Sequence, residues 1–320
     1  MKLTKYLFIF VCLMFISLTS NAKNAQTYKD KIENNFIPQK PTVHLAYLIT
    51  YKVWFIKLAS IAKATVDSTE GIWIDENTSE TNRACMVILS YYTFDQERDG
   101  DRNRVSLNDQ ILTVLTMPEL DTILYLKDTD EYMNPLFKTP TLSKSFEVYE
   151  MMDDGSLDYF SEDFITGNIS TNMDGAADLI EQGKGISSNI KLISEMYYGK
   201  RDFVTHDSDY RVHFNVDGVV KPFSVKSTKE KAPVKLAGKN PDSIKVRAQL
   251  AKEAKGKGGA MNLWAAPFRD IAALLEDEVL IETCKGQAEW SVVPLVMDYD
   301  LKLGFIRCSI NNITVNDDNK

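Results

Sequence analysis

Few residues in this sequence have the types and spacing that catalysis or metal binding requires. The three histidines are His44, His206 and His213, and no HExxH, GxSxG or phosphate-loop pattern occurs. His206 with Asp207 and Asp209 could bind a metal or act as a base, but no second histidine lies nearby in the sequence, which favours an exposed loop. We therefore predict no cofactor and no metal site, and the catalytic residues, if there are any, stay unassigned.

The segment Asp95–Asp101 has the pattern of the first half of a calcium-binding loop. Acidic residues at loop positions 1, 3 and 5 and Gly100 at position 6 fit an EF-hand. Position 12 is Ser106, where the EF-hand requires a bidentate glutamate. A charged hairpin turn, in which nearby arginines pair with the acids, is the better prediction.

Sulfur chemistry is restricted to three cysteines, Cys85, Cys284 and Cys308, once the N-terminal segment that holds Cys12 is removed. An odd number allows at most one internal disulfide. We expect Cys284–Cys308 if any forms, because both lie in strand-like C-terminal segments. That bridge requires the two segments to pair directly; otherwise Cys85 is the candidate partner, and three buried thiols are the open alternative.

The N-terminal residues 1–22 have the three parts of a secretory signal peptide. Lys2 and Lys5 precede the apolar run 6–16, and Ser20 and Ala22 supply the small residues that signal peptidase recognises. The run is shorter than the roughly 20 residues of a membrane-spanning helix, and no later segment is long enough. We expect cleavage after Ala22, export to the periplasm or outer envelope, and no transmembrane segment in the mature chain.

Charge in the mature chain is acidic and unevenly placed. Removal of the two signal-peptide lysines takes the net charge from −8 to −10, which disfavours nucleic acid as a partner. Residues 145–182 hold ten acids and no Lys or Arg, whereas residues 221–258 hold eleven basic residues and three acids. The blocks are solvated loops that attract each other or, alternatively, the second is a basic rim for an anionic partner.

Alternation of apolar and polar residues dominates the chain. Residues 23–41 look like a polar leader, so we expect order from Thr42, followed by strands at 45–55, 56–66 and 83–93 and one β-rich domain over 42–320. The segment 210–225 predicts a hairpin that turns at Asp217-Gly218, with Pro222 at a sheet edge or bulge.

The remaining elements follow from the same patterns. A second hairpin joins 290–297 to 302–313 through a turn at 298–300. Helices are expected at 106–116, 186–198 and 265–276, and 243–257 is ambiguous between strand and helix.

Several short stretches together have the pattern of a known family. LITYKV at 48–53 lies in a long strand-like segment, KLISEMYYGKR at 191–201 reads as a short helix, and VPLVM at 293–297 is followed by GFIRCSI at 304–310. On these stretches the chain resembles the exported bacterial envelope proteins grouped as family 3108 of domains of unknown function. The resemblance implies an exported, curved antiparallel sheet, similar to the half-barrels that carry lipoproteins or lipids across the envelope. It implies no established activity.

The predicted fold is mainly β, a large curved antiparallel sheet resembling a half-barrel, with a few short helices covering its concave face. Tyr47, Tyr51 and Phe214 are the predicted ligand-facing residues. We expect a non-enzymatic protein that binds a lipid or other apolar ligand, or an envelope protein, in the concavity. A hydrolase of an envelope polymer, with converging carboxylates, is the alternative. A scaffold whose charge blocks dock other copies is a third hypothesis.

Overall fold

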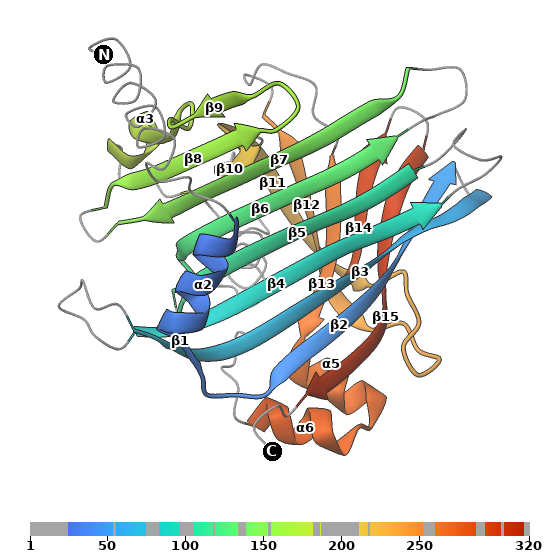
Figure 1. Ribbon diagram of the computed structural model, residues 1–320. Helices are drawn as coiled ribbons and strands as arrows, with labels where there is room; N and C mark the ends of the chain where they lie inside the picture. Colours follow the sequence, from blue (N-terminus) through green and yellow to red (C-terminus); the bar gives the residue numbers. More distant parts are fainter. Residues whose placement is uncertain are drawn as a thin grey trace, which may run out of the picture.

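The computed structural model describes residues 25–53, 56–74, 83–96, 105–117, 119–133, 139–152, 155–181, 186, 211–216, 218–251, 260–285, 292–301 and 304–316. Within them, one antiparallel sheet of 15 strands accounts for most of the chain (Figure 1). The strand order is β10-β11-β12-β13-β14-β15-β2-β3-β4-β5-β6-β7-β8-β9, with β1 paired to β3. The predicted mainly β fold with a large antiparallel sheet is confirmed.

The sheet has two limbs joined by the pairing of β15 with β2. The N-terminal limb contains β1 (Phe36–Pro38), β2 (Thr42–Val53), β3 (Ile56–Trp73), β4 (Arg83–Gln96), β5 (Val105–Thr116), β6 (Thr122–Met133), β7 (Thr141–Met151), β8 (Leu157–Asp163) and β9 (Asn168–Ser170). The C-terminal limb contains β10 (Arg211–Val216), β11 (Val219–Lys231), β12 (Asp242–Leu250), β13 (Met261–Pro267), β14 (Val292–Leu301) and β15 (Gly304–Asn316). The two limbs face each other, and their strands run in different directions (Figure 1).

The strand pairing is irregular at several places where the sheet bends. Register shifts occur between Ile310 and Asn312 where β15 meets β2, between Val114 and Leu115 in β5, and between Trp264 and Ala265 in β13. A bulge bends its strand and increases local twist. The sheet therefore curls so that one face, here named the inner face, is enclosed between the limbs, while the outer face points away.

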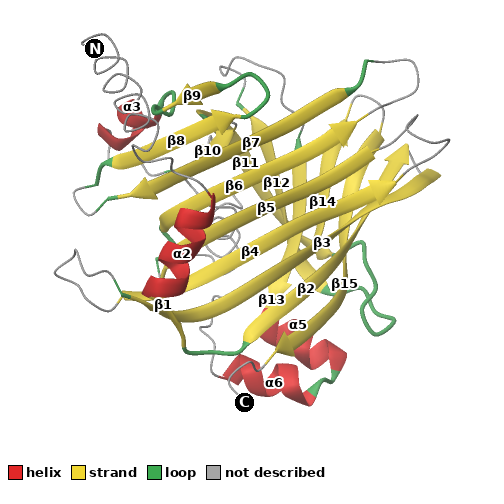
Figure 2. Cartoon of the chain, viewed as in Figure 1, coloured by secondary structure: helices red, strands yellow, loops and turns green. Residues whose placement is uncertain are grey.

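Helix α2 (Ala25–Asn35) lies across the outer face of the N-terminal limb (Figure 2). Tyr28 and Ile32, one helical turn apart, are buried there against Leu112, Leu124 and neighbouring aliphatic side chains. The expectation that order begins at Thr42 was therefore wrong. The two apolar residues have helical spacing and pack on the apolar outer face of the sheet, and Lys31 pairs with Glu150 of β7.

Helices α5 (Phe268–Leu275) and α6 (Glu278–Lys285) lie beside one end of β2 and β15. Phe268, Ile271 and Leu280 are buried in the largest apolar cluster, with inner-face residues such as Leu45. The helix predicted at 265–276 is thus present, although it begins after the strand residue Pro267. The shorter α3 (Ala176–Glu181) packs Ala176 against Tyr149 on the inner face. The predicted helix at 186–198 lies outside the described residues, apart from Ile186.

The helix predicted at 106–116 was wrong, because this segment is strand β5. Its two faces are both apolar: Leu112 and Val114 point to the outer face, and Ile111 and Leu115 to the inner face. A continuous apolar run does not alternate, so its period cannot separate a strand from a helix. The ambiguous segment 243–257 is strand β12 as far as Leu250.

Both predicted hairpins exist, with corrections. Val216 pairs with Val219 across a turn at Gly218, which has a φ of +75°. Strand β11 is not an edge strand, since β10 and β12 flank it. Pro222 is tolerated because it lies beyond the last β11–β12 pair, Phe223–Leu250, and its carbonyl accepts the N–H of Ala251 (3.0 Å). In the C-terminal hairpin, residues 298–300 belong to β14 rather than to a turn.

Candidate functional site

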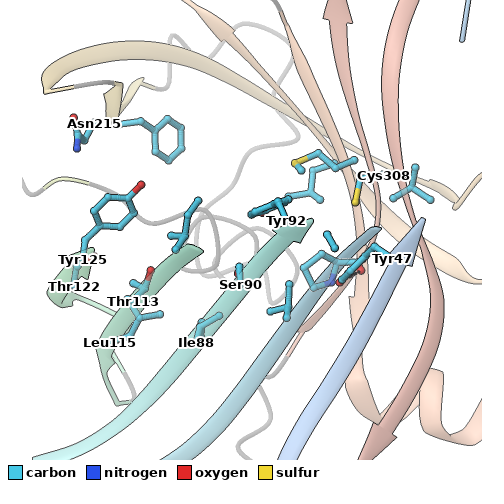
Figure 3. Close-up of a pocket in the computed structure, with 18 of the residues that line it drawn as sticks. Tyr47, Ile88, Ser90, Tyr92, Thr113, Leu115, Thr122, Tyr125, Asn215 and Cys308 are labelled. Atoms are coloured by element: carbon cyan, nitrogen blue, oxygen red, sulfur yellow. Dashed lines mark hydrogen bonds between the residues drawn. The ribbon is translucent and has the colours of Figure 1, made fainter. Parts of the chain in front are cut away.

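A cavity of about 320 Å³ lies between the two limbs, on the inner face. Figure 3 shows side chains converging on it from both limbs. The apolar part of its wall is Ala64, Val66, Ile88, Ile111, Leu115, Phe214, Leu263, Pro294, Val296 and Met297. None of the described residues that line it is an Asp, Glu, Lys, Arg or His.

The rest of the cavity wall carries neutral polar groups. Its members are Tyr47, Ser90, Tyr92, Thr113, Thr122, Tyr125, Tyr149, Asn215 and Cys308. Burial raises the pKa of Tyr92 to about 12, with smaller contributions from Cys308 and Asp109, and burial also raises the pKa of Cys308 to about 12. At neutral pH these groups are uncharged, so the cavity offers hydrogen-bonding groups without net charge.

Two of the three predicted ligand-facing residues, Tyr47 and Phe214, lie on the cavity wall. Tyr47 on β2 is 7% exposed, and its hydroxyl donates a hydrogen bond to the Pro294 carbonyl (2.8 Å). Phe214 reaches the cavity from β10, in the other limb, and packs edge-on against Phe223. The backbone of Tyr51 pairs with Ile306, but its side chain lies outside the described part of the molecule. Contact of these residues with a ligand stays a prediction.

A row of charged and polar side chains lies beside the cavity on the same inner face. It consists of Asp109 on β5, Lys127, Thr129 and Glu131 on β6, and Glu147 on β7, and we call it the polar row. Alternate residues of a strand share a face, and these residues continue the alternation of the cavity residues Ile111, Tyr125 and Tyr149. Asp109 also lies directly opposite the cavity residue Tyr92.

Asp109 and Glu131 form a carboxyl pair within this row. Burial, followed by the negative charge of Glu131, raises the pKa of Asp109 to about 6, and the two side chains share a hydrogen bond. Asp109 Oδ1 also accepts the backbone N–H of Asp130 (3.2 Å). Carboxyls in hydrogen-bond contact are closer than the roughly 5–9.5 Å that separates the paired acids of glycosidases. The pair therefore does not support the hydrolase alternative.

Glu147 connects the two limbs at the edge of the cavity. The residue is 8% exposed, and its Oε1 accepts hydrogen bonds from the Tyr159 hydroxyl and the Asn215 side-chain amide, both at 3.0 Å. Nearby, Asp174 exchanges main-chain hydrogen bonds with Gly218 (3.0 Å) and Val220 (2.9 Å). These contacts tie β7 and β8 to the β10–β11 hairpin and fix the side of the cavity that Phe214 and Asn215 form.

Comparison with known proteins gives a weak structural likeness and no sequence match. No protein-family model matches the chain, and no curated protein sequence matches it. Among solved structures, the beta-barrel-like protein of domain of unknown function DUF1849 from Brucella abortus aligns with 88% of this chain and 100% of its own. The sequence identity is 10% and the TM-score is 0.41.

The three cysteines in the described part of the chain, Cys85, Cys284 and Cys308, are free thiols. Cys284 lies on helix α6, so the premise that it occupies a strand was wrong, and direct strand pairing with Cys308 on β15 does not occur. Both residues nevertheless contact the same apolar cluster. Burial raises the pKa of Cys284 to about 11, and the pKa of Cys85 to about 12, so these thiols are protonated at neutral pH.

The other candidate chemistry residues are dispersed. His44 contacts Asp67 (2.5 Å) on β3, and His213 lies on β10, in the other limb. His206 and residues 97–104 of the predicted charged turn lie outside the described residues. Within the part that is described, no group of three or more His, Cys, Asp or Glu side chains could hold a metal ion. No helix there is long and apolar enough to cross a membrane.

Sequence reasoning missed the polar row. The signal was available in β5, where Asp109 shares its inward phase with Ile111, Thr113 and Leu115, but that segment was interpreted as a helix. A charged residue at an inward position of a strand is unusual, because burial of a charge without a partner is costly. Such a residue marks a candidate site once the strand is recognised.

Proposed function

We propose that this protein binds a small apolar or amphipathic ligand in the cavity between its two limbs, as a non-enzymatic binding or carrier protein. The observation that carries the proposal is the composition of the wall: side chains from both limbs, mainly aliphatic and aromatic, with uncharged hydroxyls among them. Ligand pockets typically combine an apolar lining with a few polar groups that orient the ligand.

The size and chemistry of the cavity restrict the ligand. A volume of about 320 Å³ is at the lower end of the roughly 300–1,000 Å³ range of small-molecule sites. The uncharged lining disfavours an ion at its centre, since an unpaired charge there would lose its hydration. Each Å² of apolar ligand surface that leaves water contributes about 25 cal/mol, so an apolar chain or ring gains most from this site.

The place of action belongs to the same proposal. The N-terminal segment 1–22 supports export to the periplasm or outer envelope, and the resemblance to family 3108 supports an envelope role. An apolar ligand in an aqueous compartment requires a protein that shields it from water. A lipid or lipid-like compound of the envelope is thus the ligand class that we propose.

A direct test is titration with the neutral fluorophore N-phenyl-1-naphthylamine, whose emission rises in apolar surroundings. The informative variant is Ser90→Phe/Thr113→Phe, which places two rings in the cavity. We expect at least a tenfold loss of probe affinity. The matched control is Thr141→Phe/Ser143→Phe, the same two changes at exposed positions of β7, which should leave affinity within twofold.

Circular dichroism and thermal unfolding establish that both variants keep the fold. Native mass spectrometry of protein purified from its own envelope then identifies what co-purifies. Absence of probe binding to the parent protein, or equal affinity of the cavity variant and its control, would contradict the proposal.

A further inference from the structure

The geometry of the polar row points to a second component of the ligand: we propose that Asp109, Glu131 and Thr129 bind the protonated amine of an amphipathic ligand whose apolar part occupies the cavity. This inference rests on the proposed function, because it assigns the chemistry of one end of the same ligand.

The polar row adjoins the cavity, so one ligand could contact both. Asp109 is the second residue before the wall residue Ile111 on β5, and it lies opposite the wall residue Tyr92 on β4. Thr129 lies on β6 two inward positions beyond the wall residue Tyr125. A ligand that extends from the cavity toward this end of β5 and β6 therefore reaches the row.

The charges of the row leave room for a cation. Among the described residues on this part of the inner face, three carboxyl groups, of Asp109, Glu131 and Glu147, accompany one ammonium group, of Lys127. Lys127 lies directly opposite Glu147 in the β6–β7 register, and Glu147 Oε1 is also held by Tyr159 and Asn215. The positive charge of Lys127 also lowers the pKa of Asp109, but one ammonium group cannot balance three carboxyl groups, so the described part of the row is negative when they are ionised. In the free protein the Asp109–Glu131 pair lowers its repulsion by sharing a hydrogen bond.

An orphan hydroxyl provides an independent sign of a ligand. Thr129 is 5% exposed, and its buried Oγ1 has no hydrogen-bond partner in the described part of the chain. The pairs Leu107–Glu131 and Gln110–Asp128 place Thr129 opposite Asp109, on the inner face. A buried polar group without a partner lowers stability, so such groups commonly mark a missing ligand or water. An ammonium group can donate to both carboxyls and to this hydroxyl at once, because it has three donors.

A metal ion fits this site less well than an amine. Only two carboxyl groups and one hydroxyl converge, and no metal-binding group of three or more acidic, His or Cys side chains exists in the described residues. Calcium requires six to eight oxygen ligands. The adjacent apolar wall has no use in binding a hydrated cation, whereas it complements the chain of an alkylamine.

The test compares dodecylamine, dodecanol and laurate, three probes with one chain and different ends, by isothermal titration calorimetry below their aggregation concentrations. The parent protein is expected to bind dodecylamine at least tenfold more tightly than laurate. The variant Asp109→Asn/Glu131→Gln keeps side-chain size and should lose roughly tenfold or more in amine affinity, because it removes the charge-assisted hydrogen bonds to the ammonium group. Its affinity for dodecanol should stay within twofold.

Two further variants make the result specific. Thr129→Val is isosteric and should weaken amine binding severalfold without affecting dodecanol. Asp242→Asn removes an acid whose side chain is 91% exposed on β12, and it should change neither affinity. Thermal unfolding of each variant confirms that the fold is retained.

The outcomes separate the two proposals. If none of the three probes binds, the proposed function fails. If dodecanol and laurate bind as tightly as the amine, or if amine binding survives in the Asp109→Asn/Glu131→Gln variant, only the amine site is overturned. Calcium binding that depends on the same two acids, without preference for the amine, would also overturn it.

Discussion

The two faces of strands β4–β7 are built for different purposes. On the outer face, side chains such as Val114, Leu124 and Leu126 are 0% exposed and pack under helix α2. On the inner face, the same strands present Ser90, Thr113 and other hydroxyl-bearing residues to a cavity of about 320 Å³.

This difference suggests separate roles for the two faces: the outer face stabilises the fold, and the inner face is available to a ligand. A core filled by aliphatic side chains stabilises the fold in proportion to the apolar area that it buries. A face with empty space and neutral hydroxyl groups buries less apolar area and therefore stabilises the fold less. Retention of such a face is explained if the space is filled by a ligand, and the predictions below test whether stability and binding separate by face.

The largest effect is expected from two neighbouring residues on β5. Leu112 is 5% exposed on the outer face, whereas Ile111 lines the cavity. Leu112→Ala should lower the free energy of unfolding by about 3 kcal/mol, because it leaves a hole in a closed core. Ile111→Ala should cost only about 1 kcal/mol, because it enlarges a space that already exists.

Urea denaturation measures both free energies, and titration with N-phenyl-1-naphthylamine measures binding. Leu112→Ala should leave probe affinity nearly unchanged when measured below the unfolding transition, whereas Ile111→Ala should alter it. Equal losses of stability at the two positions would show that the two faces do not differ as proposed.

A smaller effect is expected where α2 covers the outer face. Ile32 is 7% exposed and packs into the outer-face core, whereas the adjacent Glu33 is exposed. Ile32→Ala should destabilise the protein by about 2 kcal/mol, at the lower limit for a buried aliphatic residue because α2 is a peripheral element. Glu33→Ala is the matched control and should change stability by less than about 0.5 kcal/mol. An equal change in the free energy of unfolding for the two variants would mean that α2 does not contribute to the core.

The outer face also shows how far the sequence alone leads. Alternation in 45–66, 83–93 and 210–225 predicted strands correctly, because each of these segments has one apolar and one more polar face. The same rule failed for β5, because residues 111–115 place apolar side chains on both of its faces. It also gave no sign of α2, in whose described part Tyr28 and Ile32 are the buried apolar residues. Local periodicity reports how many faces are apolar, and it does not report what covers them.

The candidate site was less predictable than the strands. Tyr47 and Phe214 were identified individually from their strands, but their place on one cavity wall depends on how the two limbs face each other. The contact between Asp109 and Glu131 likewise depends on the β5–β6 register. These are non-local relations, and only the folded sheet establishes them.

The smallest predicted effect is a pH dependence of stability that arises from Asp109 on the inner face. The pKa of Asp109 is raised to about 6, first by burial and then by the charge of Glu131, against about 3.9 in an unfolded chain. The folded state therefore holds this proton more tightly than the unfolded state does. Its stabilising contribution is fully present below about pH 4 and is lost as the pH rises through about 6.

Asp109→Asn imitates the protonated acid at every pH, so it should have little effect on the free energy of unfolding at pH 4 and should increase it by about 1 kcal/mol at pH 7.5. The figure is reduced from the full pKa difference because the side chain is only half-buried and solvent screens its charge. Urea denaturation of both proteins at the two pH values measures it. The control is Asp130→Asn on the other face of β6, which loses an ion pair with Lys144 (3.4 Å) and should not gain stability at the higher pH. A difference between Asp109→Asn and the parent protein that is the same at pH 4 and pH 7.5 would show that the inner face does not hold this proton.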